Sequence, residues 1–495
     1  MELDFPGWLR LTHFLNIIFI SFLVRSGIEI LSSHPKLYFN DDCRHGSEWA
    51  RFTRKEMPTD KLWTSKDEEE DYSSVVALPG HSNLGLGRHW HFASVIGWIL
   101  TGLVYIVLLF TTGEWLRLIP TSWEVFAQAF RDMVTYLSLD LPEKLPGEPY
   151  NALQKLAYAG VVFVLGPLMI ATGAAMSPAV AARFPWYIKP FGGRQAARSI
   201  HFLTLLAFLL FVVVHVFMVV VHGFGKEMAL MIFGAERNTT LAVIITFAAL
   251  VGLVLLHWAA TRFSLQKPRT AQRLLGGIVN PTRKLLFRRV TSKQSYPQEA
   301  ISPAPRVNGR PPNGASYKAL AENGFKDWKL EVYGLVEHPR ALTLEELRTF
   351  PTKQTQITKH NCIQGWSYVA KWTGVPLRQI LELVKPVPEA RYLVLRAMDY
   401  KPYSEPEPEG EGYFYGTIDL ELASHPQTIL AYEMNDEPLP LPHGAPLRLR
   451  VETQLGFKMV KYVRAIEFVR DYRSVGEGLG GWREDNQFYD TGAGI

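Results

Sequence analysis

Five long apolar runs in the first 265 residues most constrain how this chain can fold. They cover residues 9–31, 92–113, 156–177, 199–223 and 240–262. A helix needs about 20 mostly apolar residues to cross the ~30 Å hydrocarbon core of a bilayer. We therefore predict an all-α transmembrane helical bundle of about five spans over residues 1–265. The first run follows acidic Glu2 and Asp4 and has no small-residue cleavage site after it, so we expect a span rather than a signal peptide.

The remaining residues have the composition of a soluble protein. Residues 317–495 alternate apolar and polar positions in short runs, with short helical patterns between them, which predicts an α+β domain with a mixed sheet. Residues 266–316 are basic and then rich in Pro and Gly, so we expect a linker that attracts anionic lipid headgroups. This linker lacks interleaved aromatic residues, which argues against nucleic-acid binding.

Basic residues in the loops predict the orientation of the bundle. Segments 32–88, 178–198 and 263–299 together carry 20 Lys and Arg, against 6 in the segments on the other side. Loops rich in Lys and Arg remain in the cytoplasm. We therefore expect the N-terminus outside and the C-terminal domain in the cytoplasm, on a multi-pass protein of the bacterial cytoplasmic membrane. The reverse topology is the alternative, because residues 32–88 also hold ten acidic residues.

Histidines inside the apolar runs form a recurring pattern. His201 and His215 lie 14 residues apart, which is ~21 Å along one face of a helix. The alternating direction of the spans pairs His91 with His201, and His13 with His215. Neutral imidazoles on facing helices are the usual axial ligands of b-type haem, whereas a single such histidine more commonly makes an interhelical hydrogen bond. Other histidines that compete as ligands are His89, His222 and His257.

This arrangement resembles the dihaem cytochrome b subunits of nickel–iron hydrogenases and formate dehydrogenases. The residues that carry the resemblance are L-R-L-T-H, R-H-W-H-F, R-S-I-H-F and V-V-V-H-V-F-M-V-V, which end at or contain the four paired histidines. The resemblance implies two haem b groups and a quinone site beside one of them, which His222 or a nearby outer residue would line. Arg25 and Arg88 would pair with haem propionates or act as simple interfacial anchors.

Cys362 is the candidate for chemistry in the C-terminal half. Most single cysteines are small buried apolar residues, but Lys359 and His360 lie just upstream, a setting that lowers the pKa of a thiol. A soft thiolate suits a transition metal. Cys43 lies far away in an unrelated context, so we expect no disulfide between the two.

Residues 305–475 resemble the sulfite-oxidase superfamily of molybdenum enzymes, and most of all the bacterial protein-methionine-sulfoxide reductase catalytic subunits. The matching motifs are C-x-x-x-W-S, W-x-G-x-P-L and the block around H-G-A-P-L-R and G-F-K-M-V-K. The resemblance implies that Cys362 is the thiolate ligand of molybdenum held by one molybdopterin, with contacts beginning near residue 305. The residues implied to bind that cofactor are Asn308, His443, Arg448, Met459, Val460 and Lys461, the last three through backbone amides and the Lys ammonium.

Some positions depart from this pattern. The reductases carry Asn where this chain has His443, whereas sulfite oxidases carry His. Tyr489 is only a loose counterpart of the active-site Tyr of sulfite oxidases. Arg396 and Arg483 are candidates for an arginine-lined sulfite pocket, and surface salt bridges are the alternative interpretation for both.

Together the two halves predict a membrane-bound molybdopterin-dependent oxidoreductase. It would transfer an oxo group to or from a small sulfur- or nitrogen-centred substrate and exchange electrons with a quinone through two b haems. The alternatives are a sulfite-oxidising dehydrogenase and a cytochrome relay with a non-catalytic docking domain. A further alternative is a transporter that uses the intramembrane histidines as a proton relay.

Overall fold

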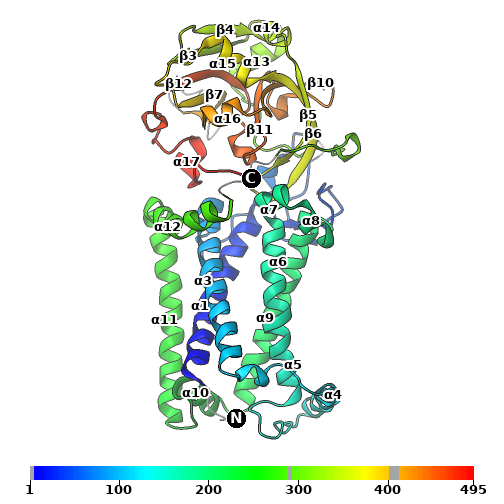
Figure 1. The fold of residues 1–495 in the computed structure, drawn as a ribbon, viewed down its shortest axis with the longest axis vertical. Coiled ribbons are helices and arrows are strands. Elements are labelled where there is room, and N and C mark those ends of the chain that lie inside the picture. Colours follow the sequence, from blue (N-terminus) through cyan, green and yellow to red (C-terminus); the bar gives the residue numbers. More distant parts are fainter. Residues whose placement is uncertain (1–4, 59, 288–292, 401–411) are drawn as a thin grey trace.

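The computed structural model of the chain describes residues 5–58, 60–287, 293–400 and 412–495. Figure 1 shows a long helical bundle that carries a domain of strands and short helices on one end. The N-terminus lies at the opposite end of the bundle, and the C-terminus lies at the junction of the two parts.

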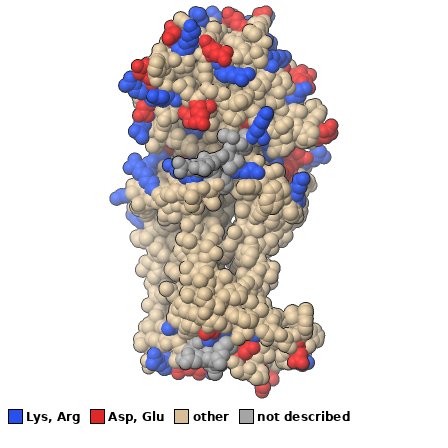
Figure 2. Space-filling model, in the orientation of Figure 1, with Lys and Arg blue, Asp and Glu red and all other residues tan. Residues whose placement is uncertain are grey.

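Five helical segments of the described chain are long and apolar enough to cross a membrane, as predicted. The third one bends through a turn of π-helix, Val161–Leu165, that joins its two halves. Large apolar side chains of these helices are exposed, and the face of the bundle seen in Figure 2 has a broad band without charged side chains. The helices are α1 (Gly7–Ser32), α3 (Leu84–Thr111), α5 and α6 (Ala152–Gly160 and Gly166–Met176), α9 (Arg194–Val221) and α11 (Thr239–Gln266).

Shorter elements cover the two ends of the bundle. α4 (Glu124–Leu137) and α10 (Phe224–Phe233) lie at the far end. At the end near the strand domain lie α2 (Ser65–Glu68), α7 (Pro178–Arg183), α8 (Pro185–Ile188) and the two-stranded ribbon of β1 (Lys36–Leu37) and β2 (Ala50–Arg51).

The range expected to be a linker contains a regular helix. α12 (Pro268–Phe287) packs against α3 and lies across the end of the bundle in Figure 1. Further along, the backbone N–H of Tyr296 donates to Ile357 and that of Ser302 donates to Val369. This second stretch therefore adds to the edge of the strand domain.

The C-terminal domain contains two five-stranded sheets. The first has the order β4-β3-β12-β7-β8, and β3 runs parallel to β12 whereas the other pairs are antiparallel, so the predicted mixed sheet is confirmed. Its strands are β3 (Lys329–Gly334), β4 (Arg340–Thr343), β7 (Tyr392–Tyr400), β8 (Tyr413–Asp419) and β12 (Val463–Val469).

The second sheet has the order β10-β9-β6-β5, with β11 also paired to β9. Its strands are β5 (Gln354–Asn361), β6 (Ser367–Pro376), β9 (Thr428–Met434), β10 (Glu437–Pro438) and β11 (Arg448–Val451). The helices around the sheets are α13 (Ala315–Glu322), α14 (Leu344–Arg348), α15 (Leu377–Val384), α16 (Leu420–Ser424) and α17 (Trp482–Gln487).

Two hydrophobic clusters explain how the parts hold together. The larger one fills the strand domain with side chains such as Leu330, Leu395 and Ile466. The second contains Cys362 together with Tyr38 and Leu84, which belong to the N-terminal half of the chain. Burial of apolar surface therefore joins the strand domain to the end of the bundle.

Candidate functional site

His13 on α1 and His215 on α9 face each other near the end of the bundle that lies far from the strand domain. Their ring centroids are 6.3 Å apart. Two imidazoles that bind one metal ion from opposite sides, with metal–nitrogen bonds of about 2 Å, have centroids roughly 6 Å apart. Nδ1 of His13 is buried and has no hydrogen-bond partner among the described residues. The pair therefore fits a metal held between the two rings.

His91 on α3 and His201 on α9 lie nearer the strand domain. Nδ1 of His91 is 3.1 Å from Oγ of Ser26, and Nδ1 of His201 is 2.9 Å from Oγ1 of Thr172. A hydroxyl on a neighbouring helix thus holds each ring by the same nitrogen.

These hydroxyl contacts determine which ring nitrogen carries the proton. Both hydroxyls also bond a backbone carbonyl oxygen one turn earlier in their own helices. A carbonyl only accepts, so it takes the single hydroxyl hydrogen, and Nδ1 of each imidazole must donate. Nε2 of His91 and of His201 then carries the lone pair that a metal ligand needs.

Of the three competing histidines, His222 and His257 use both ring nitrogens in hydrogen bonds, which leaves neither nitrogen available for a metal without rearrangement. Nδ1 of His89 bonds Gly85, and its Nε2 lies 3.2 Å from the Asp490 carboxylate without a hydrogen bond among the described residues. The hydrogen-bond partners are Met218 and Tyr136 for His222, and Arg25 and Ser21 for His257.

Arg25 and Arg88, the expected propionate partners, differ in their surroundings. Arg25 donates to Nδ1 of His257 and to the backbone carbonyl oxygens of Ser74 and Ala77, so it fastens α11 and a loop to α1. Arg88 instead lies at the junction with the strand domain, where it donates to the carbonyl oxygen of Ile363.

A cavity of about 2360 Å³ opens among the membrane-spanning helices. His13 and His215 line it, as do His222 and His257. Sites for single small ligands usually measure roughly 300–1000 Å³. The cavity therefore has room for a large planar cofactor and for a second apolar ligand.

Cys362 lies in the loop between β5 and β6, and only 3% of its surface is exposed. Its N–H donates to the carbonyl oxygen of Trp366, which closes the loop. Nδ2 of Asn308 donates to its sulfur at 3.7 Å, and the thiol contacts Oε1 of Gln364 at 3.4 Å. The predicted neighbour Asn308 and the predicted metal ligand therefore meet.

The expected activation of the thiol by its sequence neighbours is wrong. Lys359 forms an ion pair with Asp41 at 2.9 Å, and the ring of His360 contacts the Arg450 guanidinium. Burial beside Arg450 holds the pKa of His360 well below its usual value, so the ring is neutral. Burial raises the pKa of the Cys362 thiol to about 12. A bound metal would have to supply the charge that stabilises a thiolate here.

A pocket of about 50 Å³ is lined by most of the predicted cofactor residues. Cys362 does not line it but is joined to it by Asn308, which lines the pocket and contacts the cysteine sulfur. Arg483 also lines it, whereas Arg396 pairs with Glu467 at 2.6 Å, as the salt-bridge interpretation expected. Tyr489 is buried in the same cluster as Cys362 and stacks on Phe457. The predicted residues that line the pocket are Asn308, His443, Arg448, Met459 and Lys461.

The pocket carries positive charge that suits an anionic ligand. Arg448 is buried and donates to the carbonyl oxygen of His443, while its Nε has no partner among the described residues. Burial beside Arg448 and Lys461 lowers the pKa of His443 to about 3, so that ring is neutral. A buried guanidinium with an unused donor is costly unless an anion completes it.

In residues 459–461, the backbone amides differ from the expectation that they bind the cofactor, whereas the Lys461 ammonium agrees with it. The backbone N–H groups of Met459 and Val460 donate to carbonyl oxygens of Gly456 and Lys458, so they are not free. The side chain of Val460 packs in the main core. Lys461 holds its ammonium at the pocket through the carbonyl oxygens of Asn308 and Pro442.

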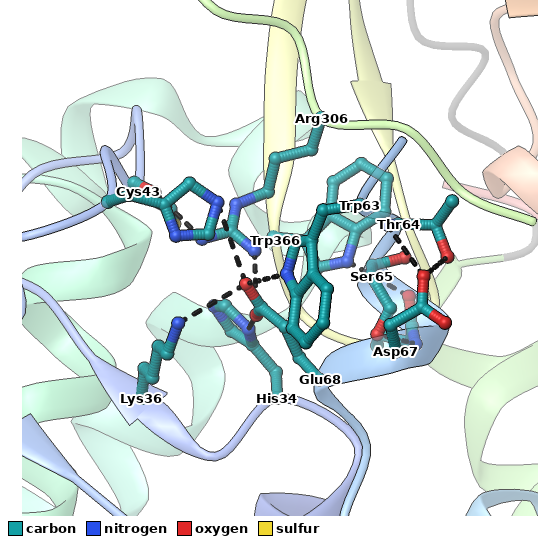
Figure 3. A network of polar contacts seen from close by, with 12 residues as sticks. His34, Lys36, Cys43, Trp63, Thr64, Ser65, Asp67, Glu68, Arg306 and Trp366 are labelled. Carbon is teal, nitrogen blue, oxygen red and sulfur yellow. Dashed lines mark hydrogen bonds and ion pairs between the residues drawn. The ribbon is translucent and has the colours of Figure 1, made fainter. Parts of the chain in front are cut away.

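Residues 33–83, which connect the first two spans and to which the sequence assigned no role, lie over this site. Figure 3 shows Glu68 at the centre of a buried polar network. Its carboxylate pairs with Arg306 at 2.9 Å and with Lys36 at 3.3 Å. These contacts, with a hydrogen bond from His34, hold the pKa of Glu68 well below its usual value, although burial opposes them. The next residue, Glu69, accepts from Gln364 at 2.6 Å.

The chain matches two known protein families. Residues 4–234 match prokaryotic cytochrome b561, and residues 318–475 match the oxidoreductase molybdopterin binding domain. The first match lies within the helical bundle and ends before α11, and the second lies within the strand domain.

Individual relatives match about a third of this chain. A putative protein-methionine-sulfoxide reductase subunit YedZ1 of Azospira oryzae is 35% identical over 32% of this chain and 54% of its own length. The protein-methionine-sulfoxide reductase catalytic subunit MsrP of Campylobacter jejuni is 31% identical over 31% and 53%. MsrP of Xanthomonas campestris is 34% identical over 31% and 48%. The chain thus spans about half the length of the curated relatives that it matches.

Proposed function

The chain joins a cytochrome b561 region to a molybdopterin-binding region, and we propose that it is a membrane-bound oxidoreductase that transfers an oxo group on a small sulfur or nitrogen oxide. Residues 1–265 form its electron-transfer unit and residues 317–495 its catalytic unit. The observation that carries the proposal is a contact between the loop that contains Cys362 and the ends of α3 and α9. These two helices also carry His91 and His201.

Two haem b groups occupy the bundle in this proposal. His13 and His215 are the axial ligands of the outer haem, supported by their 6.3 Å separation. His91 and His201 are the ligands of the inner haem, supported by the hydroxyl contacts that leave Nε2 of each ring as the acceptor. The pairs lie ~21 Å apart along α9, so electrons cross the membrane region in short steps.

Cys362 would be the protein ligand of molybdenum, and the residues of the pocket that Asn308 joins to it would hold part of the molybdopterin. When bound, this cofactor supplies two-electron oxo-transfer chemistry. Asn308 donates to the cysteine sulfur and so favours its thiolate form. Arg448 and Lys461 provide positive charge for the anionic parts of the cofactor. Burial of the loop excludes bulk water from the sulfur.

Reduction of the substrate is the favoured direction, because the relatives are named as methionine-sulfoxide reductases. Quinol in the membrane would then supply the electrons, and the large cavity beside His13 and His215 is open to such an apolar molecule. Oxidation of sulfite is the second candidate, supported by Arg483 in the pocket and by His443, where the reductases carry Asn.

The catalytic unit lies on the cytoplasmic side in this proposal. It docks on the end of the bundle where residues 33–83 and 177–193 lie, and these connections belong to the segments rich in Lys and Arg. Fusion of a reporter enzyme to the C-terminus tests this topology.

Cofactor content tests the proposed function. The full-length chain is purified from a host that makes molybdopterin, molybdenum is measured by mass spectrometry, and haem is measured as pyridine haemochrome. We expect one molybdenum and two haems per chain. Haem without molybdenum would indicate that the C-terminal domain is a non-catalytic docking module. The absence of haem would favour the transporter alternative.

A further inference from the structure

The loop that carries Cys362 rests directly on the ends of two membrane-spanning helices. We call residues 361–366 the Cys362 loop. Nη1 of Arg194 donates to Oδ1 of Asn361 at 2.7 Å, and Nε2 of Gln195 donates to the carbonyl oxygen of Gly365 at 2.9 Å. Both donors lie in the first turn of α9. The helix therefore holds the loop on both sides of the cysteine.

The contacts from α9 are buried and fixed in place. Arg194, Gln195 and Asn361 are each at most 5% exposed. Nε of Arg194 also donates to the carbonyl oxygen of Met176 at the end of α6, which sets the direction of its guanidinium. Hydrogen bonds from a charged donor in a buried site are stronger than those at a surface.

The same helices carry the histidines of the inner pair. Arg194 precedes His201 by seven residues on α9, which places both on one helix face, ~10 Å apart along the axis. Arg88 precedes His91 by three residues on α3, and its Nη1 donates to Ile363 at 3.4 Å. Each helix therefore presents a contact to the Cys362 loop and an imidazole from nearly the same side.

We propose that Arg194 and Gln195 are positioning residues that fix the Cys362 loop at a set distance from the inner haem. This inference rests on the proposed function. A redox centre needs a rigid supporting shell to keep a productive geometry, and the rate of one-electron transfer falls steeply as two centres move apart. Rigid attachment to α9 makes the cysteine and His201 parts of one body.

In the reducing direction, electron transfer over this distance couples the oxidation of quinol to the reduction of a sulfoxide. Quinol releases two electrons and two protons and becomes quinone. Haems held by the two histidine pairs would carry these electrons one at a time, and molybdenum held by Cys362 would deliver them in pairs to the substrate. Two electrons and two protons then convert a sulfoxide into a sulfide and water, with cleavage of the sulfur–oxygen bond.

The test compares Arg194→Ala and Gln195→Ala with Arg198→Ala in the full-length chain loaded with both cofactors. Arg198 is the matched control, because it lies one turn further along α9 and donates to the backbone of His34 and Lys36 rather than to the Cys362 loop. Arg194→Lys keeps the charge and tests for partial rescue.

Two readouts separate positioning from a general loss of folding. The first is the electron paramagnetic resonance signal of Mo(V), which reports the geometry of the cysteine ligand. The second is the rate at which dimethyl sulfoxide or methionine sulfoxide oxidises the reduced haems in stopped flow. We expect Arg194→Ala to keep both cofactors, to change the Mo(V) signal, and to slow oxidation of the haems by the sulfoxide by up to about 100-fold, because a cysteine loop misplaced by about 1 Å disturbs the geometry of the oxo-transfer step that feeds on these electrons.

Several results would overturn the inference. Wild-type signals and rates in both Arg194→Ala and Gln195→Ala would do so, and so would an equal loss in Arg198→Ala. If Arg194→Ala does not accumulate, Gln195→Ala removes one hydrogen bond to the same loop and decides the question alone. A wild-type chain without molybdenum or haem would instead contradict the proposed function, which keeps the two failures distinguishable.

Discussion

The imidazole rings of His13 and His215 lie 6.3 Å apart, between two helices that are not neighbours in the sequence. Their partners in the second pair, His91 and His201, lie about four turns further along the bundle toward Cys362. Two pairs stacked in this way provide a path from the far end of the bundle to the strand domain.

Substitution of one outer histidine should remove one haem. In His13→Ala or His215→Ala the haem content should fall from two per chain to one, because a single imidazole cannot complete the axial pair. Pyridine haemochrome and the reduced-minus-oxidised spectrum measure this loss. His222→Ala is the control and should keep both haems, since its ring bonds Met218 and Tyr136. Loss of a haem in His222→Ala alone would refute the assignment.

The hydroxyl of Thr172 should tune the inner haem. Thr172→Val removes the group that accepts the hydrogen bond from Nδ1 of His201. Loss of such a partner weakens metal binding by about 10–100-fold, so the inner haem should be lost first during titration with a haem-binding competitor. Thr204→Val removes a hydroxyl that bonds the backbone of the same helix and should have no such effect. Equal haem retention in the two variants would contradict this role.

Cys362→Ser should abolish turnover and leave the haem spectra unchanged. A serine hydroxyl is a poor substitute for a soft thiolate ligand. Activity with sulfoxides and with sulfite, together with the Mo(V) signal, measures the effect. Cys43→Ser is the matched control, because Cys43 is the other buried free cysteine and its sulfur contacts the backbone of Asp41 rather than Asn308. Turnover retained in Cys362→Ser would exclude this residue as the molybdenum ligand.

The buried carboxylate of Glu68 should stabilise the junction of the two parts. Glu68→Gln leaves Lys36 and Arg306 without their buried partner, which costs roughly 3–5 kcal/mol. The unfolding temperature of the purified protein should fall accordingly. Because folding lowers the pKa of Glu68 from 4.5, its stabilising effect is complete above that pH and declines as the pH falls below it.

An exposed ion pair provides the comparison for Glu68. Glu467 pairs with Arg396 where both side chains are partly exposed. Glu467→Gln should therefore change stability by less than about 1 kcal/mol. A loss from Glu68→Gln no larger than this would show that the network does not hold the junction.

The parts of the fold that depend on local pattern were predictable from the sequence. Five spans follow from apolar runs of bilayer length. The strands around Leu330 and Leu395 follow from alternation, since their inward residues form the core. The facing of His13 and His215 follows from helix periodicity and the alternating direction of the spans.

Contacts between distant segments were not predictable. Lys359 lies three residues from Cys362, yet its ammonium pairs with Asp41 from the connection between the first two spans. Arg194 reaches Asn361 across the junction of the two parts. Neither contact can be inferred from the local sequence, because each depends on how the strand domain docks on the end of the bundle. Docking also buries the thiol of Cys362, and this burial raises its pKa, whereas the neighbouring residues in the sequence predicted a lowered pKa.

Oxidation of the reduced haems by an oxo donor tests the central claim most directly. The full-length protein is reduced with dithionite, the excess reductant is removed, and methionine sulfoxide, dimethyl sulfoxide or trimethylamine oxide is added while the haem spectrum is recorded. We expect at least one of these substrates to oxidise both haems in the wild-type chain. We expect none of them to oxidise the haems in Cys362→Ser. Two negative results together would contradict the claim that the two sites exchange electrons. In the first, the reduced haems stay reduced with every oxo donor; in the second, sulfite fails to reduce the haems of the oxidised protein.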